Sequence, residues 1–191
     1  EMGTRILYLV RHGHYHMETD RAQYGKLTAL GRRQARRVGR RLASIDLRVM
    51  HHSDMLRAAE TAEIIAGELS TAIPLKPSKL LREGVPTVPC PWLPDLTRAE
   101  AQQHRARMDA AYDRYFKPPR HGQRREVVVA HAHIIRYFVS RAMGDYVIKW
   151  ARISLTQASL TVIAVGPVPG RAMLTSFNDV GHLSPEMCTF L

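Results

Sequence analysis

Short apolar runs alternate with amphipathic stretches along this sequence, and that alternation limits the fold more than any other feature. Residues 5–10 are apolar without polar alternation, which is typical of a strand buried on both faces of a parallel sheet. A helical pattern over residues 30–43 follows, with Thr28 placed to cap it, and residues 47–52 predict a second strand before an amphipathic helix at 58–69. Strands that alternate with helices predict an α/β protein, here a three-layer αβα sandwich with a mostly parallel central sheet and helices on both faces.

The second half of the chain continues the alternation after a proline-rich segment. Prolines between residues 74 and 94 are too frequent for a helix, so we expect an irregular excursion there. Residues 96–116 predict a polar helix, and residues 126–130 predict the clearest strand of the chain. The remaining predicted elements are a helix at 134–143 and strands at 160–165 and 173–177. We find no repeat or linker, so we expect one domain over residues 1–191.

Charge and cysteine usage limit the partners and the compartment. The net charge of +11 and the pI of about 10.3 favour anionic partners such as phosphoesters, nucleic acid or acidic lipid headgroups. Cys90 and Cys188 are far apart, which predicts neither a disulfide framework nor a thiolate zinc site. No apolar run reaches the roughly 20 residues that span a bilayer, and no signal peptide is visible. We therefore expect a cytoplasmic location, with a targeting segment upstream of Glu1 as the open alternative.

Residues suited to phosphate chemistry follow two of the predicted strands. Arg11, His12 and Gly13 end the first strand, and His131 ends a later one. Ligands of open α/β sheets bind beyond the carboxyl ends of the strands, so these residues should share one crevice with a bound phosphate or other oxyanion. A neutral imidazole can approach a phosphate dianion and form a phosphohistidine, whereas a carboxylate is repelled. We predict His12 as the nucleophile, with Arg11 binding the phosphoryl oxygens and Gly13 allowing close approach of the backbone.

Three further residues complete a two-step phosphatase. Arg57 falls in the first turn of a helix, where the helix N-terminus adds its own attraction for an anion, so two arginines would bind one phosphoryl group. His131 can donate to a phosphoryl oxygen and stabilise charge in the transition state. Glu83, beside apolar residues and near a bound dianion, would keep its proton and act as general acid, then as the base that activates water. This chemistry needs no metal and no other cofactor.

Five sequence blocks in fixed order resemble the histidine phosphatase superfamily, also called the phosphoglycerate mutase-like superfamily. The blocks are LVRHG at 9–13, LTxxGxxQA at 27–35, SxxxRAxxT at 53–61, REG at 82–84, and AH with IR at 130–136. The resemblance covers nearly the whole chain. It implies a phosphoglycerate mutase-like sandwich, phosphomonoester hydrolysis, and the roles given above to Arg11, His12, Arg57, Glu83 and His131. Ser53, Gly13 and His133 are candidates for lining the substrate pocket.

Within this family, residues 81–86 and 131–137 look most like the mitochondrial serine/threonine protein phosphatase branch and its bacterial relatives. That resemblance implies a protein phosphorylated on serine or threonine as the substrate. A phosphatase for nucleotides, sugar phosphates or other small phosphoesters, or a phosphoglycerate mutase-like enzyme, stays open. The span from Glu83 to His131 is shorter than the insertion of the glycolytic mutases, which favours a phosphatase. Exposed sheet edges make a homodimer a further expectation.

A metal-dependent hydrolase is one alternative, because histidines recur near the first strand. They are His12, His14 and His16, with His51, His52 and His133 further along. Imidazole is a common zinc ligand, but the carboxylates close to the histidines that follow the first strand are only Glu18 and Asp20. The arginine-rich phosphate site predicted above needs no cation, so we favour metal-independent catalysis.

A binding protein without activity is the other alternative. Six arginines form a basic stripe along the helix predicted over residues 30–43: Arg32, Arg33, Arg36, Arg37, Arg40 and Arg41. Such a stripe can bind nucleic acid or an anionic membrane surface. Charge alone is not specific, and exposed basic faces are usually just solvated, so we favour the enzyme.

Overall fold

A mixed six-stranded sheet forms the middle layer of the computed structural model, which describes residues 3–17, 24–90, 93–144, 147–166 and 172–190. The strands lie in the order β3-β2-β4-β1-β5-β6. Their bounds are β1 (Thr4–Arg11), β2 (Val49–Ser53), β3 (Leu75–Ser78), β4 (Gln123–Ala130), β5 (Leu160–Val165) and β6 (Ala172–Asp179). Strands β1 to β4 are mutually parallel, and only β5 runs against its neighbours β1 and β6. The prediction of a mostly parallel sheet is confirmed.

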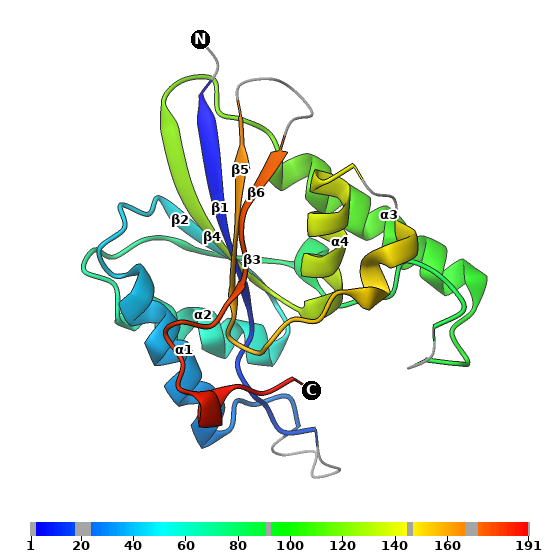
Figure 1. Cartoon of the computed structure of the whole chain (residues 1–191), viewed down its shortest axis with the longest axis horizontal. Coiled ribbons are helices and arrows are strands. Elements are labelled where there is room, and N and C mark those ends of the chain that lie inside the picture. Colours follow the sequence, from blue (N-terminus) through cyan, green and yellow to red (C-terminus); the bar gives the residue numbers. More distant parts are fainter. Residues whose placement is uncertain (1–2, 18–23, 91–92, 145–146, 167–171, 191) are drawn as a thin grey trace.

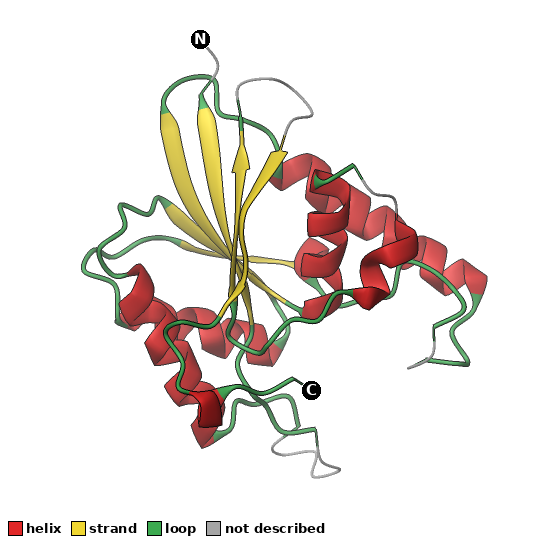
Figure 2. Cartoon of the chain, viewed as in Figure 1, coloured by secondary structure: helices red, strands yellow, loops and turns green. Residues whose placement is uncertain are grey.

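Helices cover both faces of this sheet (Figure 1). The helices are α1 (Ala29–Leu42), α2 (Leu56–Gly67), α3 (Arg98–Tyr115) and α4 (Ala132–Ala142), with short 3-10 turns η1 (Lys79–Leu81), η2 (Val147–Arg152) and η3 (Pro185–Met187). Figure 2 shows α1 and α2 on one side of the strands and α3 and α4 on the other. One apolar core packs Met50 against Ile65 of α2, and a second packs Val128 against Met108 and Phe138. The predicted three-layer sandwich is confirmed.

Helix α1 forms where the sequence predicts it, for visible local reasons. The Thr28 hydroxyl accepts a hydrogen bond from the Gly31 amide at 3.1 Å and so caps the helix. Val38 and Leu42 are fully buried, and each contributes about 1.5–3 kcal/mol through removal of apolar surface from water. The six arginines of the basic stripe are exposed on the opposite side.

The prediction of an irregular excursion from residue 74 is wrong for its first part. Leu75–Ser78 forms β3, which pairs in parallel with β2, and η1 follows with Ser78 as its cap. Proline lacks the N–H that a central strand needs, but β3 lies at the edge of the sheet, where Pro77 is tolerated. Residues 82–90 are irregular, as predicted.

The register of the parallel strands determines where the site residues lie. Arg11 at the end of β1 pairs with Ala130 at the end of β4, and His52 of β2 pairs with Val129. The carboxyl ends of three neighbouring strands are therefore level, so the residues that follow them emerge side by side. Among the described helices, none combines the length and apolar character that crossing a bilayer demands.

Candidate active site

His12 follows β1 and is held by hydrogen bonds at both ring nitrogens. Its side chain is almost completely buried. Nδ1 lies 2.8 Å from the carbonyl oxygen of Gly13, so Nδ1 carries the proton and donates it to that acceptor. Nε2 accepts a hydrogen bond from Nε of Arg57 at 3.1 Å. The imidazole therefore presents the lone pair of Nε2 toward a cationic side chain.

The surroundings of His12 keep its ring neutral. Burial is the main cause that lowers the pKa of His12 well below its ordinary value of 6.5, and the charges of Arg57 and Arg11 lower the pKa further. The ring is unprotonated near neutral pH, and an unprotonated imidazole is the nucleophilic form.

A second neutral histidine lies beside the first. His131 is fully buried at the start of α4, and its ring centroid is 5.1 Å from that of His12. Burial, followed by His12 and Arg57, lowers the pKa of His131 well below 6.5. Nε2 of His131 lies 2.8 Å from the Ser53 hydroxyl, which also accepts from the Met55 amide at 3.3 Å, and the other ring nitrogen, Nδ1, is buried. This buried Nδ1 has no hydrogen-bond partner among the residues that the structure describes.

Two buried guanidinium groups act on the histidine pair. Arg57 is the second residue of α2, and its guanidinium stacks over the Tyr15 ring, 4.6 Å from the centroid. Arg11 donates to the Leu155 carbonyl at 2.5 Å and to the Phe190 carbonyl at 3.5 Å. Burial lowers the pKa of Arg11 to about 10, so its side chain still carries a positive charge at neutral pH.

Gly13 is close to the protein backbone of α1. A Cβ at Gly13 would lie 2.7 Å from the carbonyl oxygen of Gly31, a separation at which the two segments would have to move apart. The Gly13 amide donates to Oγ1 of Thr61 at 3.1 Å, which fixes the turn that follows β1. The sequence assigns Gly13 to phosphate approach, while the structure adds a packing requirement from α1.

Glu83 and His133 meet beside this buried group. The Glu83 carboxylate accepts from the His133 amide at 3.2 Å and from the Gly84 amide at 3.3 Å. Nδ1 of His133 lies 3.8 Å from the same carboxylate, and its ring packs edge-on against Trp150. Burial lowers the pKa of His133, partly opposed by the negative charge of Glu83. Glu83 therefore contacts the first turn of α4, which begins just after His131.

Side chains that the sequence did not single out fix the segment that carries Glu83. Arg82 forms a two-point ion pair with Asp54, with both N–O distances at 2.7 Å. Arg107 of α3 donates to the carbonyl oxygens of Arg82 and Glu83. No local pattern in α3 marks Arg107, because its partners are main-chain atoms about 25 residues away.

Two other site residues were missed for different reasons. Thr61 stands within the SxxxRAxxT block, one helical turn after Arg57, so its spacing was a usable signal. Tyr15 packs edge-on against His12, with 5.0 Å between ring centroids, but it lies in a polar loop without periodicity. Nothing in the sequence distinguishes it from the neighbouring residues.

The histidines of the metal alternative are spread over separate partners. His14 hydrogen-bonds Thr28 at 2.9 Å, and His51 lies 3.4 Å from Glu126. In the part of the chain that the structure describes, no three His, Cys, Asp or Glu side chains are grouped as a metal site would require. Glu18 and Asp20 lie outside the described residues. The metal alternative therefore gains no support from the assembled geometry.

A protein-family model matches most of the chain. The model of the histidine phosphatase superfamily (branch 1) matches residues 7–85 and 89–179. That span includes both buried histidines, both arginines and Glu83.

Curated relatives match almost the whole chain. The mitochondrial serine/threonine-protein phosphatase Pgam5 of Caenorhabditis elegans is 37% identical over 196 residues, which cover 98% of this chain and 67% of that protein. The corresponding PGAM5 of Homo sapiens is 35% identical, covering 97% of this chain and 66% of its own length. The chain thus spans about two thirds of these relatives. Their names place those proteins in mitochondria, which differs from the cytoplasmic location expected above.

Solved structures share the fold. A phosphoglycerate mutase from Plasmodium falciparum superposes with a TM-score of 0.65 at 28% identity and covers 99% of both chains. A phosphoglycerate mutase from Bacillus anthracis reaches a TM-score of 0.73 at 20% identity, with 95% of this chain and 96% of that chain covered. The second match supports the sandwich architecture alone.

Proposed function

The chain belongs to the histidine phosphatase superfamily (branch 1) and is a phosphoric monoester hydrolase, and we propose that it works through a phosphohistidine on His12 and acts on proteins phosphorylated at serine or threonine. Membership of an enzyme family argues against the basic binding module considered above. Three of the exposed arginines of α1 form ion pairs with carboxylates of the same chain: Arg32 with Glu60, Arg40 with Glu68 and Arg41 with Asp179.

In the first step, Nε2 of His12 attacks phosphorus and the ester P–O bond breaks. Arg11 and Arg57 donate hydrogen bonds to the phosphoryl oxygens. The Nδ1–H of His131 donates to a phosphoryl oxygen on which negative charge increases in the transition state. The Glu83 carboxyl gives its proton to the departing alkoxide, leaving a carboxylate and a phosphohistidine.

In the second step, the Glu83 carboxylate takes a proton from water, and the resulting hydroxide attacks the phosphohistidine. The N–P bond breaks, inorganic phosphate forms, and Nε2 of His12 recovers its lone pair. Glu83 has regained its proton from the water molecule, so the enzyme returns to its starting state without a metal or another cofactor. Each role falls on a side chain of the chain itself.

A single observation carries this proposal. His12 is buried, neutral, and held at Nδ1 so that only Nε2 is available, 3.1 Å from a buried guanidinium. Buried cations cost free energy unless an opposite charge approaches them, and a phosphate dianion supplies that charge at the nucleophile. A structural histidine needs neither an unprotonated Nε2 that faces a guanidinium group nor a second buried cation close by.

The protein substrate is supported by the relatives. Those that match at 35–37% identity are named serine/threonine-protein phosphatases. The chain covers about two thirds of their length, so their substrates are brought here as a proposal. The cytoplasmic location and the homodimer stay predictions, which fluorescence microscopy of a tagged full-length protein and light scattering would check.

A small phosphoester is the second candidate substrate. The solved phosphoglycerate mutase that is 28% identical covers 99% of this chain, which keeps a small phosphorylated metabolite in view. Both candidates use the same buried group and differ only in what the entrance accepts.

Comparing kcat/KM across two substrate groups tests the proposal. Phosphoserine and phosphothreonine peptides form one group, and nucleoside monophosphates, sugar phosphates and phosphoglycerate form the other. We expect higher values for the peptides and a loss of at least about 10,000-fold for all esters in His12→Asn. The control His121→Asn, on an exposed turn, should match the unaltered protein. Higher values for the small esters would move the assignment to the second candidate, and full activity in His12→Asn would reject the mechanism.

A further inference from the structure

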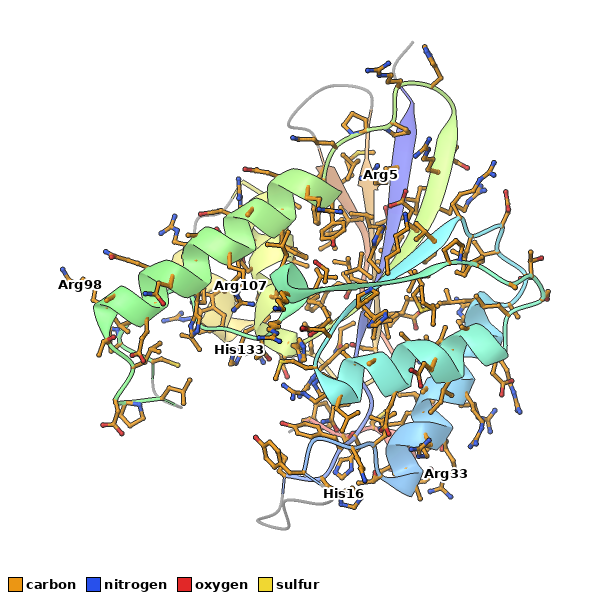
Figure 3. The ribbon with its side chains drawn as sticks, turned by 180° about the vertical axis from the view of Figure 1, so that it is seen from behind. Arg5, His16, Arg33, Arg98, Arg107 and His133 are labelled. Atoms are coloured by element: carbon orange, nitrogen blue, oxygen red, sulfur yellow. The ribbon has the colours of Figure 1, made fainter. Side chains whose placement is uncertain are left out.

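We propose that Arg107 is a positioning residue that places Glu83 for proton transfer, an inference that rests on the role of Glu83 in the proposed function. Arg107 lies on α3, which contributes no residue to the buried histidine and arginine group. Figure 3 shows Arg107 pointing from this helix toward the segment that follows β3, with His133 close by. The acid and the phosphate-binding group would then be aligned by a helix that the sequence motifs do not include.

The contacts of Arg107 are with the carbonyl oxygens of two successive peptide units, one on each side of the Cα of Glu83. Nη1 donates to the carbonyl oxygen of Arg82, and Nη2 donates to the carbonyl oxygen of Glu83 at 2.9 Å. Two donors on one planar group fix the two peptide units that flank the Cα of Glu83, and so the direction in which its side chain leaves the backbone. The Glu83 side chain is left to accept from the His133 amide at 3.2 Å.

The same helix meets the segment at two further points. A Cβ at Gly84 would lie 2.5 Å from Nη2 of Arg107 and 3.0 Å from Cγ of His104, so the loop already packs tightly on α3. The Val85 amide donates to Nδ1 of His104 at 3.2 Å. On the other side, the Arg82 side chain pairs with Asp54, just before α2. Glu83 thus lies between an anchor just before α2 and anchors on α3.

An alternative role for Arg107 is to bind the substrate directly. Both of its terminal nitrogens already donate to carbonyl oxygens, and the side chain is half-buried between α3 and the loop. A substrate contact would have to break those hydrogen bonds. The positioning role therefore predicts an effect on kcat, whereas a substrate contact predicts an effect on KM.

Leaving-group dependence separates positioning from a general loss. A phosphoserine peptide needs a proton on its alkoxide, and 4-nitrophenyl phosphate needs little help. In Arg107→Gln we expect the rate constant of phosphoryl transfer to His12, measured in single turnovers, to fall about 10- to 100-fold for the peptide and less than about 3-fold for the nitrophenyl ester, with KM within about 3-fold for both. Arg107→Lys, which can keep one of the two donations, should fall between these limits for the peptide.

Two comparisons make this test specific. Arg105→Gln removes a cation on the same helix whose contact with Asp109 is long, at 3.9 Å, so it should leave kcat unchanged for both esters. In Glu83→Gln there is no proton to place, so adding Arg107→Gln should cause no further loss for the peptide. Thermal unfolding of each variant shows whether the chain still folds. If Arg107→Gln does not fold, the kinetics of Arg107→Lys are compared with those of the unaltered protein instead.

Each contrary result has a separate meaning. Three results would overturn the positioning role of Arg107. They are equal losses of rate for the two esters, a double variant whose loss is the product of the losses in Arg107→Gln and Glu83→Gln, and a change confined to KM. The proposed function itself fails if the unaltered protein hydrolyses neither ester, or if a variant with His12 replaced still hydrolyses them. The role of Arg107 then fails as well. Unaltered hydrolysis that depends on His12, with a peptide-specific loss in Arg107→Gln, supports both.

Discussion

The floor of the site and its rim are built in different ways. We call Arg11, His12, Arg57 and His131 the floor, and residues 82–85 with their anchors the rim. Floor side chains are at most 8% exposed and follow the ends of sheet strands or begin a helix. In the rim, the Glu83 side chain is 25% exposed. Hydrogen bonds from a side chain of α3 and an ion pair with Asp54, in the turn before α2, hold the loop. Main-chain pairing therefore fixes the floor, while side chains fix the rim.

This difference assigns separate tasks to the two regions. The floor gathers positive charge and two neutral imidazoles, which serve any phosphomonoester because all share the phosphoryl group. The rim holds a carboxyl group whose help depends on the leaving group. Substitutions in the floor should harm all substrates alike, and substitutions in the rim should discriminate among them.

The largest effect is expected from the floor arginine on α2. Arg57→Ala removes a phosphoryl contact and the hydrogen bond to Nε2 of His12, so kcat/KM should fall about 1,000-fold for alkyl and nitrophenyl esters alike. Steady-state kinetics on both esters measures this. Arg33→Ala, an exposed arginine of α1, is the matched control and should change neither value. A loss limited to alkyl esters would erase the proposed distinction between floor and rim.

A smaller and selective effect is expected from the rim. Glu83→Gln keeps the shape of the side chain but has no proton to give, so kcat/KM for a phosphoserine peptide should fall about 100-fold. The loss of kcat/KM for 4-nitrophenyl phosphate should stay below about 5-fold, because kcat/KM reports the transfer of the phosphoryl group to His12 and this leaving group departs without a proton. The ratio of the two losses is the quantity to measure. A ratio near one would remove Glu83 from the acid role.

The smallest effect concerns stability, and it sharpens the description of the floor. His131 has a folded pKa well below 6.5, so between those two values the unfolded chain binds a proton that the folded chain does not. Its contribution is fully present above pH 6.5 and is lost as the pH falls toward the folded pKa, by about 1 kcal/mol per pH unit. In His131→Asn the free energy of unfolding, from urea titrations at pH 5 to 7.5, should depend less steeply on pH. An unchanged slope would mean that His131 is not held neutral.

The floor could be predicted from the sequence because its geometry follows from strand ends. Once residues 5–10 and 126–130 are taken as neighbouring parallel strands, His12 and His131 must emerge at the same edge, and the pairing of Arg11 with Ala130 agrees. The same reasoning places Arg57 after the next strand of the sheet. Periodicity and strand order are properties that a sequence displays directly.

The rim was less accessible to prediction because its geometry depends on distant side chains. Glu83 was found through a motif, but Arg107 is held by carbonyl oxygens that any residue would supply, so no residue type reveals the contact. Pro77 concealed β3, since a proline argues against a central strand and edge position is known only after the sheet is assembled. Tertiary context decided both cases.

Trapping the covalent intermediate distinguishes phosphoryl transfer to His12 from direct attack of water on the ester. Rapid quenching of the protein with a phosphoester labelled in its phosphoryl group, followed by peptide mapping under alkaline conditions, locates the transferred phosphate. The account predicts an acid-labile phosphohistidine on Nε2 of His12, formed in Glu83→Gln as well when the nitrophenyl ester is used, and absent in His12→Asn. Phosphate on another residue, or turnover with no phosphorylated protein at any quench time, would contradict it.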